Sequence, residues 1–177
     1  KFIFQNKQDL YDFKLKYVSL KNTNLNLIAG SGVPNKYFDF NKIKHKWLSQ
    51  KENQVDKNCT LIFNARLLRS KGIFKFSELS DKLKESQFKV FGEKDLACHD
   101  SLDNRDLEKI KKSNNNIEFM GFAEDPLLNI EYKFPILIVP SLYSEGMPRG
   151  ILEAMALCIP VISTSFAPRG MIGDELI

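Results

Sequence analysis

Two glutamates bracket a short loop near the C-terminal end of the sequence. Glu145 and Glu153 lie in VPSLYSEGMPRGILEAMALCIPVIST, residues 139–164, whose pattern predicts a strand, a loop, a helix and a second strand. Pro148 suits the first turn of that helix, where a missing N–H costs little. A helix N-terminus favours an anion, and the N–H donors around this one are those of Gly146, Met147, Arg149 and Gly150.

The two glutamates have different surroundings in the sequence. A carboxylate binds a vicinal diol because each of its oxygens accepts a hydrogen bond from one hydroxyl. Glu145 stands in the loop before the expected helix, where it can accept from sugar hydroxyls or, alternatively, stabilise the helix N-terminus. Glu153 falls within the first two helical turns among apolar neighbours, so we expect it to need a partner. A solvated helix position is the alternative for Glu153.

Two bases, Arg66 and Lys71, follow an earlier apolar run in ARLLRSKG, residues 65–72. Arginine offers planar paired donors and lysine a mobile point charge, and together they suit a diphosphate. Gly72 lets the chain turn into the next helix. The alternative is that these are two surface bases at the start of a helix.

Glycines end two other apolar runs. Gly92 follows FKVF, and Gly121, with Phe122 after it, follows IEFM. Glycine permits close approach of the backbone to a ligand, and Phe122 can border a nucleotide base. Simple turns are the alternative, which we favour slightly for Gly92.

Strand-like and helix-like patterns alternate from residue 59 to residue 163, which predicts an α/β fold with a doubly wound parallel sheet. Ligands bind such sheets outside the carboxyl ends of the strands, where Arg66, Lys71 and Glu145 fall. Upstream, Asn6 is expected to cap a helix between two short strands. The expected strands are 1–5, 25–28, 59–64, 88–91, 117–120, 135–139 and 160–163, and the further expected helices are 42–51, 73–85, 103–112, 126–132 and 150–157.

The composition is that of an ordinary globular protein. Of 177 residues, 43% are hydrophobic and 27% are charged, which suffices for one well-buried domain. No apolar run approaches the roughly 18 residues of a membrane span. The net charge of +4 fits solvated helix faces, with attraction to an anionic membrane or a phosphorylated ligand as the alternative. No nucleic-acid-binding pattern is present.

The cysteines and the start of the sequence carry two further expectations. Three separated cysteines indicate neither a disulfide framework nor a zinc site, and they favour the reducing cytosol. Because the sequence starts at Lys1 within a strand-like run, we expect a piece of a longer protein, cut at both ends.

The segments ARLLRSKG, FKVFGEKD, IEFMGF and ILIVPSLYSEGMPRGILEAMALCIPVIST resemble the C-terminal domain of glycosyltransferase family 4, whose retaining enzymes have the GT-B fold and use nucleotide sugars. FIFQNKQDL and NLIAGSGVP resemble the end of the family's N-terminal domain. The resemblance implies that residues 1–38 are the end of an N-terminal acceptor domain with its linker. Residues 39–177 would be a C-terminal nucleotide-sugar-binding domain, truncated at its C-terminus.

The resemblance also implies an activity. The enzyme would be a hexosyltransferase of bacterial capsule, lipopolysaccharide or glycan biosynthesis, acting in the cytoplasm, with attachment to the inner face of the membrane left open. The donor would be a UDP- or GDP-linked sugar and the acceptor a glycan or a lipid-linked molecule. No cofactor, metal or nucleic acid would take part, because bases and a helix N-terminus stabilise the charge.

Each candidate residue receives a role from the resemblance. Arg66, Lys71 and Glu145 would be the catalytic set: the two bases bind the donor diphosphate, and Glu145 contacts the donor sugar. Glu153 would bind the ribose hydroxyls. The remaining contacts to the sugar, the phosphates and the base would come from Gly146, Met147, Pro148, Arg149 and Gly150, and from Gly121 and Phe122.

This sequence departs from the family pattern at three places. Ala65 stands where glycine is frequent, and Ala167 and Pro168 stand near a frequent glycine pair. Cys158 replaces a helix-ending glycine, so we expect this helix to end differently. A sugar-nucleotide epimerase of related fold and a catalytically silent nucleotide-binding module stay open as alternatives. The isolated 1–177 chain is expected to bind nucleotide sugar weakly without turnover.

Overall fold

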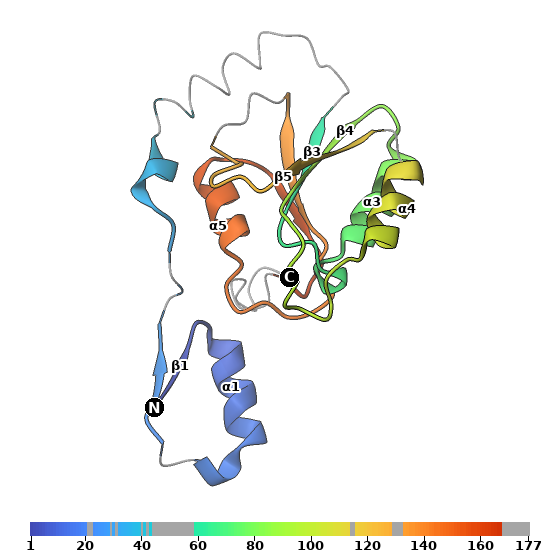
Figure 1. Cartoon of the computed structure of the whole chain (residues 1–177). Helices are drawn as coiled ribbons and strands as arrows, with labels where there is room; N and C mark the ends of the chain where they lie inside the picture. The colour runs from blue at the N-terminus through green and yellow to red at the C-terminus, as the bar shows by residue number, and fades with distance from the viewer. Residues whose placement is uncertain are drawn as a thin grey trace.

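The computed structural model describes residues 1–20, 23–28, 30, 32–39, 41, 43, 59–113, 116–128 and 133–167. Figure 1 shows a small N-terminal unit that contains β1 and α1, and a larger body built on a sheet. The carboxyl ends of the sheet strands point toward the N-terminal unit (Figure 1). The helix predicted over residues 42–51 lies almost entirely outside the described residues.

The larger body contains a five-stranded sheet in the order β5-β4-β3-β6-β7, with every strand parallel to its neighbours. In its centre, Leu61 pairs with Phe88 on one side and with Ile136 on the other. The α/β class with a doubly wound parallel sheet, predicted from the sequence, is confirmed. The strands are β3 (Thr60–Asn64), β4 (Gln87–Phe91), β5 (Ile117–Gly121), β6 (Pro135–Val139) and β7 (Val161–Ser163).

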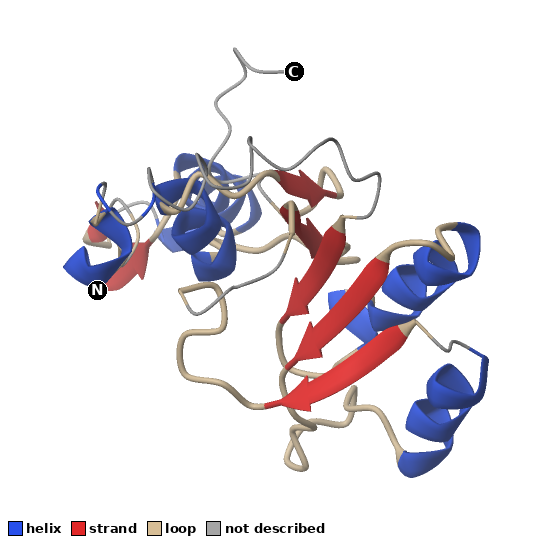
Figure 2. Ribbon diagram, turned by 90° about the horizontal axis from the view of Figure 1, so that it is seen from above, coloured by secondary structure: helices blue, strands red, loops and turns tan. Residues whose placement is uncertain are grey.

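Helices cover both faces of this sheet, as a parallel sheet requires. α3 (Ile73–Lys82) and α4 (Asn104–Ser113) lie on one face, and α5 (Arg149–Ala156) lies on the other (Figure 2). The core under α3 and α4 includes Leu61, Phe63, Ile73, Phe76, Phe88, Val90 and Ile110. The core under α5 includes Ile62, Phe91, Leu127, Leu137, Ala154 and Ile159.

The N-terminal unit pairs two short parallel strands and packs one helix against them. The ring of Phe13 lies 4.9 Å from that of Phe2 and 5.1 Å from that of Phe4. Asn6 caps the helix as predicted, because its side-chain oxygen accepts a 2.8 Å hydrogen bond from the N–H of Asp9. The predicted domain boundary after residue 38 stays a prediction. The elements here are β1 (Phe2–Phe4), α1 (Lys7–Lys16), η1 (Val18–Leu20), β2 (Leu25–Leu27) and η2 (Asn35–Phe38).

The expectation that α5 would avoid a glycine-type ending is wrong. Cys158 has φ of 56°, the left-handed conformation that glycine usually supplies. The N–H of Cys158 donates to Met155 O at 3.0 Å, and the N–H of Ile159 donates to Ala154 O at 2.8 Å. These are the two hydrogen bonds of a Schellman ending. Ile159 and Ala154 also share the apolar core under α5, and this burial offsets the strain at the cysteine.

Two smaller expectations are also corrected. Residues 126–128 form a turn rather than the start of a helix, and the rest of the helix predicted over 126–132 lies outside the described residues. Pro148 is the N-cap residue of α5 rather than a member of its first turn, with extended backbone angles. The proline still removes no hydrogen bond from the helix, because an N-cap N–H has no partner within it.

Candidate functional site

A cavity of about 230 Å³ lies at the carboxyl ends of β3 and β6. Its walls come from the ends of these two strands, from the segments that follow them, and from the first turn of α5. This is the position in which open parallel sheets bind ligands. The predicted site residues that line the cavity are Arg66, Lys71, Glu145, Pro148, Arg149 and Gly150.

A close backbone approach brings the two walls together. Gly72 has φ of +81°, and a Cβ on it would lie 1.9 Å from the carbonyl oxygen of Pro140. Both the backbone angle and the lack of space therefore demand glycine. Since Gly72 ends the short helix η3 (Arg69–Lys71), this contact places Lys71 directly beside the segment after β6.

Lys71 and Glu145 form an ion pair across the cavity. Nζ of Lys71 lies 2.9 Å from Oε2 of Glu145, and both side chains are only 14% exposed. The other oxygen of Glu145 accepts a hydrogen bond from the hydroxyl of Ser141. The ammonium group also lies 5.0 Å from the ring centroid of Tyr143. An ammonium has three N–H donors, so Lys71 can hold Glu145 and a ligand oxygen at once.

Arg66 occupies a more open position on the same wall. Its side chain is 60% exposed, and Nη1 lies 2.6 Å from Oδ2 of Asp95, in the segment after β4. An ion pair at such exposure is worth little. An anionic ligand in the cavity can therefore compete with Asp95 for the guanidinium group.

Glu153 is buried, so the alternative of a solvated helix position is wrong. Its side chain is 8% exposed, and Oε1 accepts a 2.7 Å hydrogen bond from Nε of Arg149 one helical turn earlier. This is the partner that its apolar neighbours in the sequence led us to expect. Among the described residues, Glu153 does not belong to the cavity lining, whereas Arg149 does.

A buried tyrosine that the sequence did not single out packs beside α5. Tyr37, in η2, has no exposed surface, and its hydroxyl donates a 2.8 Å hydrogen bond to Oδ1 of Asp125. Lys36 forms an ion pair with the other oxygen of the same carboxylate. Burial, and then the bond to Asp125, raise the pKa of Tyr37. The hydrogen bonds from Lys36 and Tyr37 lower the pKa of Asp125.

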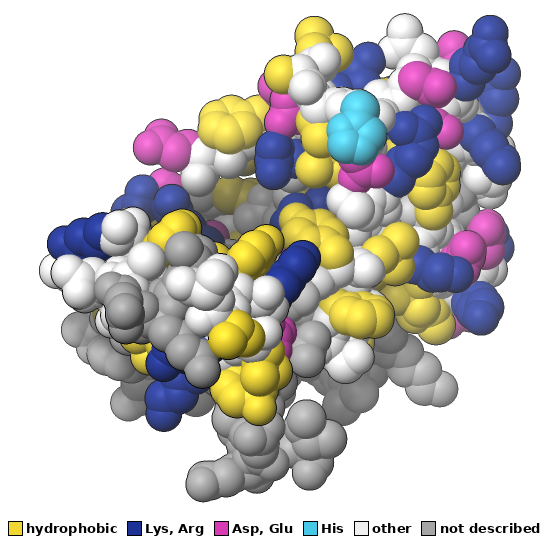
Figure 3. Space-filling model, turned by 90° about the horizontal axis from the view of Figure 1, so that it is seen from below, with side chains coloured by type: hydrophobic (Ala, Val, Ile, Leu, Met, Phe, Trp, Pro, Cys, Tyr) yellow, Lys and Arg dark blue, Asp and Glu magenta, His cyan; other side chains and the backbone are white. Residues whose placement is uncertain are grey.

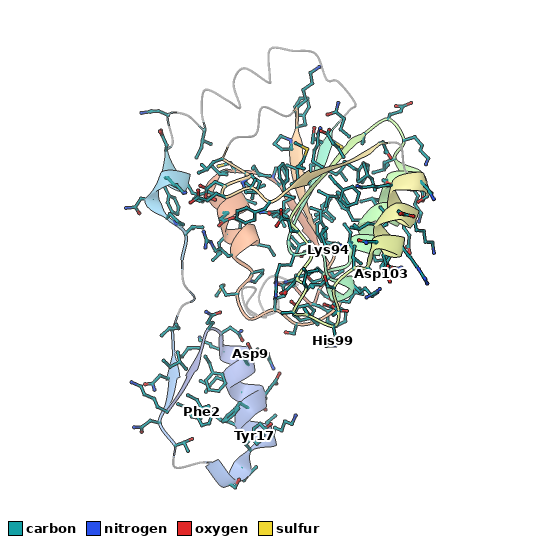
Figure 4. The ribbon with its side chains drawn as sticks, viewed as in Figure 1. Phe2, Asp9, Tyr17, Lys94, His99 and Asp103 are labelled. Carbon is teal, nitrogen blue, oxygen red and sulfur yellow. The ribbon has the colours of Figure 1, made fainter. Side chains whose placement is uncertain are left out.

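The loop before α5 touches the N-terminal unit. The side-chain amide of Asn6 donates a 2.9 Å hydrogen bond to the carbonyl oxygen of Gly146, and the side chain of Met147 lies against Gly30. Asp9 lies at the end of α1 nearest the larger body (Figure 4). Seen from below, the surface is hollowed between the N-terminal unit and the larger body, and Lys and Arg side chains border the hollow (Figure 3). The loop is thus held from both bodies.

The structure does not bring Gly121 and Phe122 to the same cavity. Gly121 lines a second cavity of about 450 Å³, together with Gly92, Lys111 and Phe119. Phe122 is 72% exposed. The proposed contact of these two residues with a nucleotide base stays a prediction.

In the part of the chain that the structure describes, no three His, Cys, Asp or Glu residues gather in a group able to hold a metal ion. Among the same residues, no helix has the length and apolar character needed to cross a membrane.

Comparison with known sequences identifies relatives of this chain. Glycosyltransferase TuaC of Bacillus subtilis (strain 168), named for teichuronic acid biosynthesis, is 32% identical over 103 residues. That match covers 58% of this chain and 24% of TuaC. The chain thus spans about a quarter of the length of this relative.

Solved structures share the fold. A glycosyltransferase from Rickettsia africae ESF-5 matches with a TM-score of 0.66 and 19% identity, over 97% of this chain and 46% of that one. Alr3699/HepE of Anabaena, solved with UDP and glucose, matches with a TM-score of 0.62 and 15% identity, over 91% of this chain and 43% of that one. At these identities the likeness is one of fold, and that fold is the GT-B fold of glycosyltransferases.

The family described as "Glycosyl transferases group 1" matches residues 58–176, which include the whole five-stranded sheet and the cavity at its carboxyl edge. The predicted resemblance to GT-B glycosyltransferases is therefore confirmed, and the chain belongs to the glycosyl transferases group 1 family.

Proposed function

We propose that this chain binds the donor in a retaining hexosyltransferase that moves a sugar from a nucleotide to a glycan or a lipid-linked acceptor. The proposal depends on one observation above all. A mostly buried ammonium, a guanidinium and a helix N-terminus converge on one cavity at the carboxyl ends of β3 and β6. This is a site for a diphosphate, because each group carries positive charge or N–H donors toward the same space.

The proposed roles follow from position. Arg66 and Lys71 bind the diphosphate, and they stabilise the charge that develops on the departing nucleotide. Glu145, already held by Lys71 and Ser141, presents its carboxylate to the hydroxyls of the transferred sugar. The N–H groups of Arg149 and Gly150 face the phosphates, since they begin α5.

Glu153 and Gly121 have weaker geometric support. Glu153 is paired with Arg149 behind the cavity wall, so ribose binding requires the arginine to share this carboxylate. Gly121 borders the second cavity, which would take the base. The structure of HepE with UDP and glucose supports a UDP-linked donor by fold alone, and GDP is the alternative.

The acceptor is proposed from the names of relatives. TuaC is named for teichuronic acid biosynthesis, and WaaG, whose crystal structure has a TM-score of 0.64, is described as involved in lipopolysaccharide biosynthesis. Both names assign a glycosyltransferase to the biosynthesis of a polysaccharide-containing polymer. We propose a bacterial surface polysaccharide or glycan as the product, and the cytoplasm, at or near the inner face of the membrane, as the place of synthesis.

Calorimetric titration with UDP and with GDP tests the donor site. We expect one nucleotide to bind, and Arg66→Ala and Lys71→Met each to weaken it about tenfold or more, since each removes a charge-assisted contact. Lys75→Met is the matched control, because Lys75 lies on the first turn of α3 with a 60% exposed side chain outside the cavity. Equal affinities for the wild-type chain and both site variants would contradict the proposal.

A further inference from the structure

The segment after β4 reaches the diphosphate site through Asp95, which pairs with Arg66, and through a second carboxylate, that of Asp100. Oδ2 of Asp100 accepts a 2.9 Å hydrogen bond from the backbone N–H of Ser70, and it also accepts one from the hydroxyl of Ser70. Both donors belong to the residue that immediately precedes Lys71. Asp100 lies outside the lining of the cavity, so its influence on a ligand passes through Ser70.

Ser70 is held from its other side by the loop after β6. Its carbonyl oxygen accepts a 2.8 Å hydrogen bond from the N–H of Leu142, which lies three residues before Glu145. Ser70 is therefore fixed between two loops that come from strands on opposite sides of β3. The residue that follows, Lys71, then meets Glu145 at 2.9 Å.

Backbone hydrogen bonds keep these segments together independently of the Asp100 side chain. The N–H of Arg69 donates to Asp100 O at 2.9 Å, and the N–H of Leu102 donates to Leu67 O at 2.9 Å. The carboxylate of Asp100 thus fixes the position of Ser70 between segments that backbone hydrogen bonds already hold together. Removing it is expected to loosen Ser70 and leave the fold intact.

We propose that Asp100 is a positioning residue of the diphosphate site. Its hydrogen bonds hold Ser70 against the loop after β6, and they thereby set the location of the Lys71 ammonium. The inference rests on the proposed function. Hydrogen bonds from Ser70 lower the pKa of Asp100, so the carboxylate is ionised and accepts both bonds throughout the neutral range. The segment between residues 92 and 102, which carries Lys94 and His99 (Figure 4), is thereby assigned a part in donor binding.

The affinity of UDP and GDP relative to UMP and GMP tests this proposal. A misplaced Lys71 loses a contact that the second phosphate needs, whereas general loosening of the fold weakens both kinds of nucleotide alike. We expect Asp100→Ala to reduce the preference for the diphosphate about tenfold. Asp100→Asn should restore most of that preference, because an amide oxygen can accept the same two hydrogen bonds.

Asp103→Ala is the matched control. Asp103 lies three positions after Asp100, and its Oδ1 caps α4 by accepting a 2.8 Å hydrogen bond from the N–H of Asp106. Its contact with η3 is an exposed ion pair of 3.8 Å with Arg69, which is worth little. We expect this variant to lower Tm and to leave the diphosphate preference unchanged. Ser70→Ala, which removes only the hydroxyl bond, should give a smaller loss than Asp100→Ala and provides the test if Asp100→Ala folds poorly.

The outcomes separate this inference from the proposed function. If Lys71→Met abolishes the preference for diphosphates while Asp100→Ala and Ser70→Ala keep it, the positioning role is wrong and the donor site stands. If the wild-type chain binds neither diphosphate, both proposals are overturned. A loss in Asp100→Ala that Asp100→Asn restores supports the positioning role.

Discussion

The two faces of the five-stranded sheet are packed by different kinds of side chain. Under α3 and α4, the ring of Phe76 lies 5.6 Å from that of Phe63 and 5.1 Å from that of Phe88, the latter edge-on. On the α5 face, the buried groups include the carboxylate of Glu153 and the hydroxyl of Tyr37. Aromatic packing stabilises without offering a binding group. Buried polar groups each require a partner, and they can exchange that partner for a ligand.

This difference assigns most of the stability to the aromatic face and the diphosphate chemistry to the α5 face. The core of the first face is built from apolar contacts around Phe76, which lines neither cavity. The second face borders the cavity through α5 and the loop before it. Substitutions on the two faces should therefore affect stability and nucleotide binding in different proportions.

The largest effect is expected from Phe76→Ala, because Phe76 is fully buried in the aromatic core. Loss of the ring should reduce the free energy of unfolding by about 3–5 kcal/mol. Urea denaturation measures the change, and nucleotide affinity in the folded fraction should be unaltered. Met155→Ala, on the exposed side of α5, is the control and should change stability by about 0.5 kcal/mol or less. A loss as small as the control's would show that the aromatic core does not dominate stability.

A gain in stability is expected from Cys158→Gly. The left-handed conformation at Cys158 costs about 1 kcal/mol, and glycine adopts it without strain. Thermal unfolding should shift upward by about 2–4 °C. Ala156→Gly, two positions earlier and inside α5, should shift it downward instead, since glycine there only weakens a helix. A downward shift for both variants would mean that the Schellman ending is absent.

A smaller loss is expected from Tyr37→Phe, which keeps the buried ring and removes its hydrogen bond to Asp125. One hydrogen bond of this kind corresponds to a decrease in Tm of about 2–4 °C. Tyr11→Phe is the control, because Tyr11 is 57% exposed on α1. Identical Tm values for Tyr37→Phe and the wild-type chain would indicate that η2 is not held through Asp125.

The smallest effect is a pH dependence at the same contact. The pKa of Asp125 is lowered from 3.8 by the bonds from Lys36 and Tyr37. Its contribution to stability is therefore complete above the ordinary pKa and disappears as the pH falls through the lowered value. The difference in Tm between the wild-type chain and Asp125→Asn should shrink between pH 5 and pH 2. A difference that stays constant over this range would contradict the assignment.

Local features were predictable from the sequence. The apolar run Pro135–Val139 has the predicted bounds of β6, and Asn6 caps α1 as predicted. Short-range patterns determine both features, since strand character depends on neighbours and a cap depends on the next few N–H groups.

Contacts between distant segments were not predictable. Tyr37 meets Asp125, and Ser70 meets Asp100, across many intervening residues and without any repeated spacing. Such pairs depend on which strands become neighbours, and one sequence does not specify that. The prediction of how α5 ends at Cys158 was wrong for another reason. A local propensity was overridden by the burial of Ile159, whose gain depends on the packed sheet.

The location of the bound diphosphate tests the central claim most directly. Titration of the isotopically labelled chain with UDP or GDP, followed by amide NMR shifts, reports that location residue by residue. We predict the largest shifts at Lys71, Glu145 and Gly150, around the cavity at the carboxyl ends of β3 and β6. Shifts confined to α4, or the absence of any saturable shift with either nucleotide, would contradict the account.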